Sequence, residues 1–463
     1  MIGARRAWGL MALWLLLTCV AAMPCAAAGF RDQVVEKTLP NGLKVILHEQ
    51  HRVPLVTFQV WYRVGSRNEA WGNTGLSHML EHMMFKGTPQ VGPEAFSRII
   101  QEHGGEDNAF TSRDFTAYFE ELSAAAVPVA IELEADRMQH LVLRDEDFHT
   151  ERLVVMEERR LRTDDNPQAA LLEQLEATAY QTSPYHWPII GWMEDLARLT
   201  VADLETHYHT YYHPANAFIV AVGDFQVADL LPRIEQAFGV HPSGTAPDQQ
   251  KNIDPPQSGE RRLILKRVAQ LPSLLMGYHV PNLREPDSYV LEVIAAILSQ
   301  GQSSRLYHSL VRDKRLAFEA NADYSLLSRD RGLFFLSATP LPGKDASEVE
   351  QAIDQALARL QGEPVSAREL DKAKHQLEAA FVMGQDSLFA QAMLLAQYEI
   401  AHSWRAIDDY LPAIRRVSAA DIQRVASRYL IPDNRTVGVL MPLPPQEGQA
   451  PPSGMSLHEP LVR

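Results

Sequence analysis

The sequence predicts an α+β fold of two homologous halves, each a sandwich of a β-sheet and helices. One basis is an internal repeat: "TVADLETHYHTYYHPANAFIVAVGD" begins at Thr200 and "SAADIQRVASRYLIPDNRTVGVLMP" begins at Ser418, an offset of 418 − 200 = 218 residues. Several residues are identical at this offset without a gap: Asp203 and Asp421, Tyr211 and Tyr429, Pro214 and Pro432, and Asn216 and Asn434. Each copy has a helix that stops before a proline, then a turn and a β-branched run typical of a buried strand. The other basis is the mixture of strand and helix patterns within each half.

In the first half, "LPNGLKVILHE" and "PLVTFQVWYRVGS" predict two strands, and the Asn41-Gly42 turn signal precedes the first of them. Four helical stretches follow: "GLSHMLEHMMF", "PEAFSRIIQEHG", "AAVPVAIELEADRMQHL" and "DEDFHTERLVVMEERRLR". Between the second and third of these helices, "NAFTSRDFTAYF" alternates enough to predict one more strand. Strands joined as antiparallel hairpins and covered by helices give the sandwich expected for each half.

The chain divides into five segments. We assign residues 1–28 to a signal peptide, 29–242 to the first repeat domain, 243–260 to a linker, 261–445 to the second repeat domain, and 446–463 to a Pro-rich tail. The linker "SGTAPDQQKNIDPPQSGE" is rich in turn residues, which favour an irregular connection between two domains.

The N-terminal segment has the pattern of a secretory signal. Arg5 and Arg6 precede the apolar run "WGLMALWLLLTCVAA", and Ala26 to Ala28 offer the small residues of a cleavage site, so we expect cleavage after Ala28 and a periplasmic or secreted protein. An uncleaved anchor is the alternative, although an apolar run of about 15 residues is short against the roughly 20 that span a membrane. No membrane span is expected after cleavage. Both cysteines lie in this segment, so the mature chain would depend on its apolar core rather than on disulfides.

The charge balance excludes some partners. The chain has 43 Lys and Arg against 58 Asp and Glu, and loss of the two signal arginines gives 41 − 58 = −17. An acidic surface argues against nucleic acid and anionic membranes as partners, although it identifies no substrate.

The stretch "GLSHMLEHMMF" carries the strongest chemical signal. On a helix, His78 and His82 lie about 40° apart and Glu81 lies about 60° to the far side of His78, so one face carries two imidazoles and a carboxylate. Two histidines at this spacing can chelate one zinc ion, and the carboxylate beside them can take a proton from zinc-bound water. The alternative is that all three are ordinary helix-surface residues.

A catalytic zinc site wants a third protein ligand. The helix "ERLVVMEERR" offers Glu151, Glu157 and Glu158. Glu151 and Glu158 are two turns apart and share a face, whereas Glu157 points elsewhere. Zinc is the default metal, but two histidines and a carboxylate also suit other divalent ions.

Taken together, "GLSHMLEHMMFKGT", "GGEDNAFTSRDFTAYF", "ERLVVMEE", "SPYHWPIIGW" and "YYHPANAFIVAVGDF" resemble the pitrilysin or insulinase family of zinc peptidases, the inverzincins, in the family's order along the whole mature chain. The resemblance implies a clamshell-like arrangement, one Zn²⁺ per chain in the first half, and a degenerate second half, where "EVIAAILSQG" retains no ligand set. It makes His78, His82 and Glu158 the zinc ligands and Glu81 the general base. Glu151 matches a family glutamate that supports the ligands or the substrate amine.

Two further stretches have competing interpretations. The resemblance places Asn108 and Ala109 on an edge strand that holds the substrate peptide beside the zinc, whereas the residues alone also suit a turn asparagine that leads into a core strand. The tract "HYHTYYHP", with His207, His209 and His213, suggests a metal site. Its counterpart "ASRYLIP" has no histidine, so we expect ordinary residues at the end of the repeated helix.

The second half departs from the family pattern. Many members carry an arginine and a tyrosine that hold the substrate, and in "LVRDKRLAFEA" Arg312 matches the arginine while Phe318 stands where the tyrosine is expected. A phenyl ring cannot donate a hydrogen bond to a developing oxyanion. Phe318 is then either a core residue, with Tyr324 or water in the tyrosine's role, or a sign that a partner completes the site.

We therefore expect a zinc-dependent endopeptidase that hydrolyses peptides or small unfolded polypeptides. One alternative is a zinc-binding subunit that is weakly active alone and is completed by a second homologous subunit without the zinc motif; a homodimer is also open. The others are a non-catalytic structural partner subunit and a zinc hydrolase that acts on another kind of bond.

Overall fold

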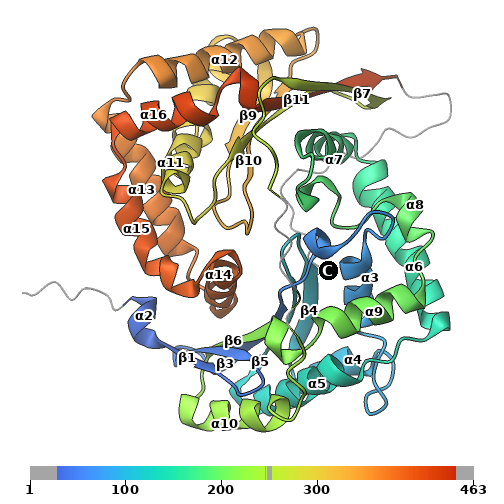
Figure 1. Ribbon diagram of the computed structural model, residues 1–463. Coiled ribbons are helices and arrows are strands. Elements are labelled where there is room, and N and C mark those ends of the chain that lie inside the picture. The colour runs from blue at the N-terminus through green and yellow to red at the C-terminus, as the bar shows by residue number, and fades with distance from the viewer. Residues whose placement is uncertain (1–28, 246, 248–252, 445–463) are drawn as a thin grey trace, which may run out of the picture.

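The computed structural model describes residues 29–245, 247 and 253–444, and it contains two mixed β-sheets, each covered by helices (Figure 1). The predicted signal peptide, both cysteines, part of the predicted linker and the whole predicted tail lie outside the described residues. The first sheet has the strand order β1-β2-β6-β3-β5-β4 and the second has the order β7-β11-β8-β10-β9. The described chain is thus an α+β protein with one sheet in each half, as the sequence predicts.

The strands of the first sheet are β1 (Val34–Thr38), β2 (Lys44–Glu49), β3 (Leu55–Tyr62), β4 (Glu106–Thr111), β5 (Thr116–Ser123) and β6 (Ala217–Gly223). Those of the second are β7 (Arg261–Val268), β8 (Ser273–Val280), β9 (Ala317–Asp323), β10 (Gly332–Pro340) and β11 (Arg435–Leu443). In both sheets the last strand of the half is inserted between earlier ones: β6 runs parallel to β2 and antiparallel to β3, and β11 runs parallel to β7 and antiparallel to β8. The sheets are therefore mixed rather than built of hairpins alone.

The helices of the first half are α2 (Phe30–Gln33), α3 (Leu76–Met83), α4 (Ala95–Glu102), α5 (Val127–His140), α6 (Asp145–Arg159), α7 (Pro167–Ala179), α8 (Met193–Leu196), α9 (Val201–Tyr211) and α10 (Val227–Phe238). Those of the second half are α11 (Asp287–Ser299), α12 (Ala346–Gly362), α13 (Ala367–Met383), α14 (Leu388–Ala401), α15 (Ile407–Arg416) and α16 (Ala419–Tyr429). Among the described residues no single helix is long and apolar enough to cross a membrane; α13 and α14 would pass such a test only as a pair, and they are bent by 114°.

The internal repeat is confirmed in its local structure. Helices α9 and α16 begin with the same capping box, formed by Thr200 with Asp203 and by Ser418 with Asp421. After each helix, an asparagine amide donates a hydrogen bond to the carbonyl oxygen of the helix's last tyrosine: from Asn216 to Tyr211 at 2.9 Å, and from Asn434 to Tyr429 at 2.8 Å.

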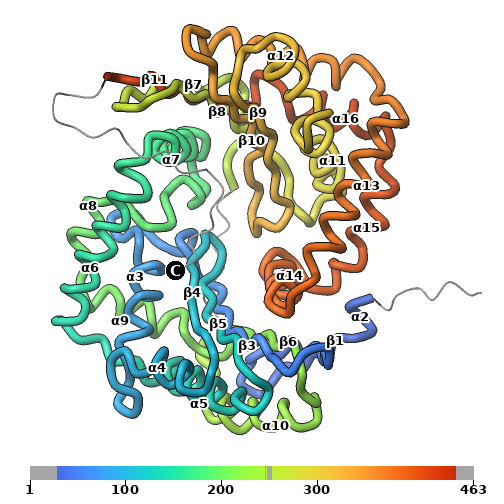
Figure 2. Tube along the Cα trace, turned by 180° about the vertical axis from the view of Figure 1, so that it is seen from behind, coloured from blue at the N-terminus to red at the C-terminus, as the bar shows by residue number. Residues whose placement is uncertain are grey.

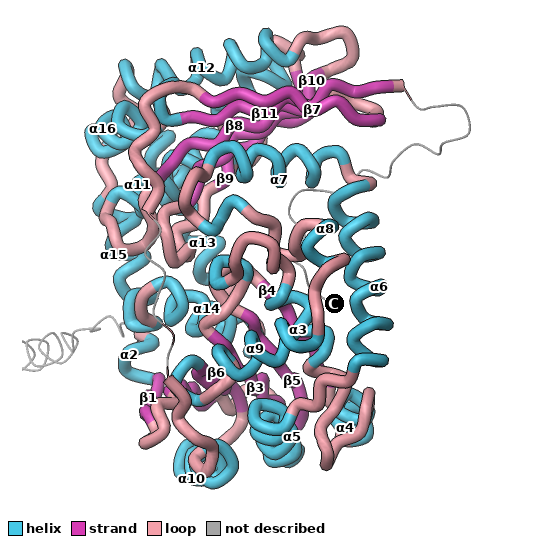
Figure 3. The backbone as a smooth tube through the Cα atoms, turned by 45° about the vertical axis from the view of Figure 1, so that its right-hand side comes forward, coloured by secondary structure: helices cyan, strands magenta, loops and turns pink. Residues whose placement is uncertain are grey.

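One helix from each half packs on the sheet of the other half. Leu171 and Leu175 of α7, from the first half, pack on Leu275 and Leu440 of the second sheet, along which α7 runs in Figure 3. Conversely, α14 of the second half lies against β3 and β6 of the first sheet (Figures 1 and 2), and the Phe119 and Phe389 rings are 4.7 Å apart. The exchange ties the halves together, because separating them would expose apolar surface on both sheets.

Alternate side chains along β6 contribute to two different hydrophobic cores. Phe218, Val220 and Val222 join the core that is shared with the second half, while Ile219 and Ala221 join the core beneath the first-half helices. Both faces of this central strand are therefore buried, which explains its continuous apolar run.

The expectation of one strand over residues 108–119 is wrong, because this segment is a hairpin. Its arms are β4 and β5, and the turn is closed by a 2.8 Å hydrogen bond from the Ser112 N–H to the Phe115 carbonyl oxygen. The turn contains neither Gly nor Pro, so the polar and apolar alternation runs through it and conceals the reversal. The reversal places β4 at the edge of the first sheet.

Candidate metal centre

The N-terminus of α3 is held by a buried carboxylate. Glu69 accepts hydrogen bonds from the Gly75 N–H at 2.7 Å and from the Ser77 N–H at 2.8 Å. Burial raises the pKa of Glu69 to about 8, although these backbone hydrogen bonds act in the opposite direction. Gly75 has φ +89°, and a Cβ there would lie 2.6 Å from the Ile190 carbonyl oxygen. These hydrogen bonds and the close approach at Gly75 fix the position at which α3 begins.

Three side chains converge as the sequence predicts for a metal site. The Glu158 Oε2 atom lies 3.4 Å from His82 Nε2 and 3.7 Å from His78 Nε2, and the three ligand atoms all lie within 4.8 Å of one another. A tetrahedral zinc ion with bonds of about 2.0–2.1 Å places its ligand atoms roughly 3.3 Å apart. The donor set therefore fits zinc in both chemistry and spacing. Among the residues described, it is the only group of three such donors that could hold a metal ion.

Glu151 orients one of the histidines. Its Oε1 atom lies 2.7 Å from His82 Nδ1, and its Oε2 atom accepts a hydrogen bond from Lys86 Nζ at 2.8 Å. With Nδ1 engaged by a carboxylate, Nε2 is the ring nitrogen left for a metal. Burial would raise the pKa of Glu151, but the hydrogen bonds with His82 and Lys86 outweigh it and lower the pKa to about 2.

Glu158 is also held in its ionised form. Burial would raise its pKa, but hydrogen bonding with His82 and the charges of His78 and Arg162 lower it to about 2. Arg162 reaches the second carboxylate oxygen at 3.1 Å. Glu157, by contrast, has a side chain 58% exposed and pairs with Arg160 at 2.8 Å, away from the cluster.

Glu81 is buried on the same helix as the histidines, and its Oε2 atom accepts a hydrogen bond from the Thr111 hydroxyl at 2.5 Å. Thr111 ends β4, so the edge strand and Glu81 are in direct contact. Sequence reasoning missed Thr111, Glu69 and Lys86. Only Lys86 had a local signal, because it follows His82 by four residues.

A cavity of about 520 Å³ opens between α3 and the edge strand; we call it the β4 cavity. It is lined by His82, Phe85, Lys86, Glu94, Ser97, Asp107, Asn108 and Glu151. Asn108 thus lies beside the metal cluster, and its side-chain oxygen accepts a hydrogen bond from the Ala109 N–H at 2.8 Å. The Ala109 side chain is buried in the first-half core, which leaves only its backbone for a peptide.

The second-half candidates lie on the surface. Arg312 pairs with its neighbour Asp313 at 2.7 Å. Phe318 is 52% exposed on β9, an edge strand, so the interpretation of Phe318 as a core residue is wrong. Tyr324 was considered as a replacement for the tyrosine expected at position 318. Its hydroxyl donates a hydrogen bond to the Pro281 carbonyl oxygen at 2.6 Å and is therefore already engaged. Figures 1 and 2 both place β9 in the half opposite α3.

The histidine tract is structural, as expected. His207 is buried with Nε2 3.2 Å from the Ser77 hydroxyl, and burial lowers its pKa to about 3. His213 is buried with Nε2 3.2 Å from the Thr210 carbonyl oxygen, and His209 is exposed. None of the three belongs to the metal cluster.

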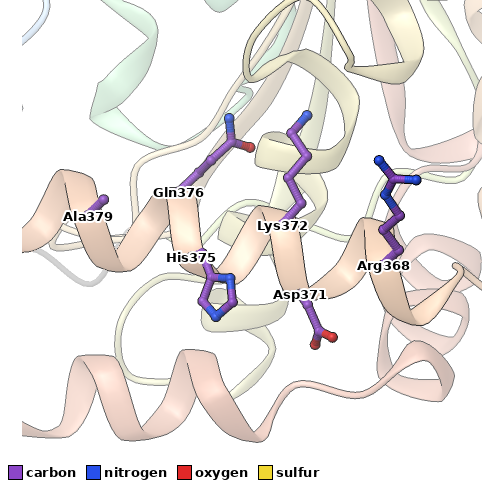
Figure 4. A pocket seen from close by; sticks show the side chains of 6 residues that line it. All are labelled: Arg368, Asp371, Lys372, His375, Gln376 and Ala379. Atoms are coloured by element: carbon purple, nitrogen blue, oxygen red, sulfur yellow. The ribbon is translucent and has the colours of Figure 1, made fainter.

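A second hollow, of about 730 Å³, lies along α13. Lys372 and Gln376 project from one side of this helix and Asp371 and His375 from the other (Figure 4), so these side chains do not converge on a common point.

Comparisons with known proteins agree with this geometry. Residues 44–191 match the family model described as insulinase (peptidase family M16), and residues 198–377 match the peptidase M16 inactive domain. The zinc protease PqqE of Helicobacter pylori is 32% identical over 451 residues, which cover 95% of this chain and 99% of that protein. The uncharacterized zinc protease YmxG of Bacillus subtilis is 26% identical over 410 residues, 88% of this chain and 97% of that protein.

Solved structures of other proteins have a similar fold. The crystal structure of a protease from Helicobacter pylori aligns with a TM-score of 0.85 at 32% identity and covers 89% of this chain and 99% of that one. The structure of an M16-like peptidase from Alicyclobacillus acidocaldarius, at 21% identity, has a TM-score of 0.77 over 89% of this chain and 98% of its own, and it shares the fold.

Proposed function

Because the chain belongs to the M16 (insulinase or pitrilysin) family of zinc proteases, we propose that it is a zinc-dependent endopeptidase that hydrolyses peptides or small unfolded polypeptides. The convergence of His78, His82 and Glu158 is the observation that carries this proposal. The donor set is the one that catalytic zinc uses, with three protein ligands and room for a fourth.

In the proposed mechanism, zinc supplies Lewis acidity, which polarises the scissile carbonyl and makes water a stronger acid. Glu81 accepts the proton of the attacking water and passes it to the leaving amine. The Thr111 hydroxyl donates to Glu81 Oε2 and so fixes the carboxylate, and Glu151 orients His82 through Nδ1. No covalent intermediate with the protein is needed.

The substrate would bind as an extra strand. β4 lies at the sheet edge, and an edge strand offers backbone N–H and C=O groups to an extended peptide. Asn108 lines the cavity beside His82, so a peptide paired with β4 would pass the metal. An extended or unfolded substrate follows from this mode of binding.

We also propose that the isolated chain is weakly active and that a second homologous subunit without the zinc motif completes the site; a homodimer is the alternative. Arg312 is exposed, and within the described part of the chain it contacts its near neighbours Asp313 and His308; Phe318 offers no hydroxyl. The N-terminal pattern supports export, with cleavage after Ala28.

Metal analysis and a peptide digest test the function together. The purified chain should carry one zinc ion, and mass spectrometry should find cleavage of an unstructured polypeptide that a chelator abolishes and a partner subunit increases. Zinc without any cleavage, even with the partner, would support the non-catalytic alternative. Ester cleavage without peptide cleavage would support another kind of zinc hydrolase. Full activity from a verified monomer, unchanged by any partner, would contradict the need for a second subunit.

A further inference from the structure

The β4 cavity joins the metal cluster to the edge strand. His82 and Glu151 form its wall on the metal side, and Asp107 and Asn108 of β4 form the wall where a peptide would pair. In a β-sheet, the side chain of a substrate residue opposite Asp107 points to the same face as Asp107. A side chain close to the scissile bond would therefore enter this cavity.

The cavity contains two carboxylates without a cationic partner. Glu151 is neutralised by Lys86 at 2.8 Å and engaged by His82. For Glu94 and Asp107, however, no ion pair is found within the described part of the chain. The Ser97 hydroxyl donates a 2.6 Å hydrogen bond to Asp107 Oδ2, which fixes this carboxylate without neutralising it.

Charges behind the cavity do not cancel its acidity. The Arg137 guanidinium lies 5.2 Å from the centroid of the Phe85 ring, which lines the cavity. Arg137 is itself paired with Glu134 and lies 3.5 Å from Glu120. The group behind Phe85 therefore adds no net positive charge.

Glu94 is held in an unusual conformation. Its φ is +58°, and only one other non-glycine residue among those described, Arg315, has a positive φ. Residues other than glycine adopt this region infrequently, and strain of this kind gathers at functional sites. A hydrogen bond from the Glu94 N–H to the Phe85 carbonyl oxygen at 3.2 Å ties the residue to the cavity's aromatic wall.

We propose that the β4 cavity is the side-chain subsite beside the scissile bond and that it selects lysine or arginine; this inference rests on the proposed endopeptidase function. The aliphatic stem of the basic side chain lies on Phe85, and its charged end meets Asp107 and Glu94. The same two carboxylates repel acidic side chains. The chain's formal net charge of −15 also favours the approach of cationic peptides.

Matched peptides test this selection. In one internally quenched peptide, each position that flanks the scissile bond is replaced in turn by lysine, norleucine or glutamate, and kcat/KM is measured with the zinc-loaded full chain. At one of these positions, lysine should exceed norleucine by about tenfold and glutamate by about a hundredfold, as expected for hydrogen bonds to charged groups.

Variants identify the groups responsible through the lysine-to-norleucine ratio of kcat/KM. Asp107→Asn should bring this ratio close to one, and Asp107→Lys should shift the preference toward glutamate. Glu94→Gln, at an exposed position, should lower the ratio by only about two- to threefold. Glu106→Gln is the matched control, because Glu106 is an exposed neighbour on β4 whose side chain does not line the cavity; the ratio should stay at the wild-type value.

The outcomes separate the two proposals. Equal cleavage of the lysine and norleucine peptides, a preference for an aromatic residue, or an unchanged ratio in Asp107→Asn would overturn the basic subsite while the endopeptidase function stands. Failure of the zinc-loaded chain to cleave any peptide, even with the partner subunit, would overturn the proposed function and the subsite with it. If the Asp107 variants prove unfolded by thermal melting, the wild-type ratio and Glu94→Gln decide the question.

Discussion

Helices α3 and α11 overlap at the repeat offset, yet only α3 carries the candidate zinc ligands and the proposed base. At the repeat offset of 218 residues, His78 falls on Ala296, Glu81 on Ser299 and His82 on Gln300. Both helices are largely buried. The buried polar groups of α3 have partners in Glu69, Glu151 and Thr111, whereas α11 buries an apolar face. A buried polar helix is tolerated only where other elements supply such partners.

The supporting helices differ in the same way. Glu151 and Glu158 of α6 fall on Glu369 and Gln376 of α13. Glu369 instead pairs with Arg305 at 2.7 Å and is part of the surface. At the repeat offset, the second half therefore shares the scaffold and one glutamate of the first half, but it has no counterpart of the three candidate zinc ligands.

The largest effect on activity is expected from a substitution of Glu81, the proposed base on α3. Glu81→Gln should keep its zinc, because Glu81 is not a ligand, and should lose roughly 10²–10⁴-fold in turnover, as a missing general base does. Zinc content by elemental analysis and kcat on one peptide measure the two effects separately. His82→Ala, which gives α3 a residue without a donor, should lose metal and activity together. Glu81→Gln that is isolated without zinc, or that is fully active, would contradict these roles.

Substitutions of the α6 carboxylates should differ in their effect on zinc affinity according to how close each carboxylate lies to the metal cluster. Glu158→Gln should weaken zinc affinity strongly, and Glu151→Gln should lose roughly 10–100-fold in affinity or activity as a group that orients a ligand. Glu157→Gln is the control on the same helix and should change little, because its side chain points to solvent. A competition titration with a chelator measures all three. Equal effects at Glu157 and Glu158 would show that the wrong ligand was chosen.

At the repeat offset, Glu69, which lies before α3, falls on Asp287, the first residue of α11, and the two offer a third comparison. Glu69→Gln replaces one acceptor oxygen by a donor that faces a backbone N–H, so the free energy of unfolding should fall by about 1–3 kcal/mol. Zinc affinity should fall as well, because the N-terminus of α3 loses its anchor.

Asp287→Asn is the matched control, because Asp287 pairs with Arg424 and accepts a hydrogen bond from Tyr429, and neither contacts the metal cluster. It should lower stability only. Thermal melts and the chelator titration distinguish the two; unchanged zinc affinity in Glu69→Gln would remove Glu69 from the support of the site.

A pH titration should distinguish α9 from α16. His207 of α9 is buried with a pKa lowered to about 3, and Val425 stands at the equivalent position of α16. Because the folded-state pKa is lowered, the neutral histidine is tolerated above its unfolded pKa, and stability is lost as pH falls below about 6.5. Between pH 7 and pH 5 the wild type should lose about 2 kcal/mol more than His207→Val, as measured by urea unfolding at each pH. Parallel pH profiles would contradict this assignment.

The smallest effect concerns β9. Phe318→Tyr introduces the hydroxyl that the family resemblance leads us to expect at this position, and the activity of the isolated chain should rise by no more than roughly tenfold, because one hydrogen bond is added. Phe335→Tyr, on β10 of the same sheet and packed beside α7, is a control that adds a hydroxyl elsewhere. A peptide assay with and without the partner subunit measures the change. Equal gains in both variants would show that the effect is not local to position 318.

Much of the site could be predicted because its signals are local. Helical periodicity alone placed His78 beside His82 and separated Glu157 from Glu158, and the three predicted ligands meet in the structure. Pro214 and Pro432 likewise marked the ends of the repeated helices, since a proline ends a helix locally. The assignment of Glu158 over Glu151 as the ligand came from the family resemblance rather than from the helix geometry.

The exchange of α7 and α14, the β4–β5 hairpin and the hydrogen bond from Thr111 to Glu81 left no signature in local periodicity. An amphipathic helix shows that it has an apolar face, but not which sheet will cover it, and alternation continues through a turn that lacks glycine and proline. Thr111 meets Glu81 only because the hairpin folds the edge strand back over α3. Residue spacing was thus enough for contacts within one helix, whereas contacts between elements distant in sequence depended on how the two sheets pack.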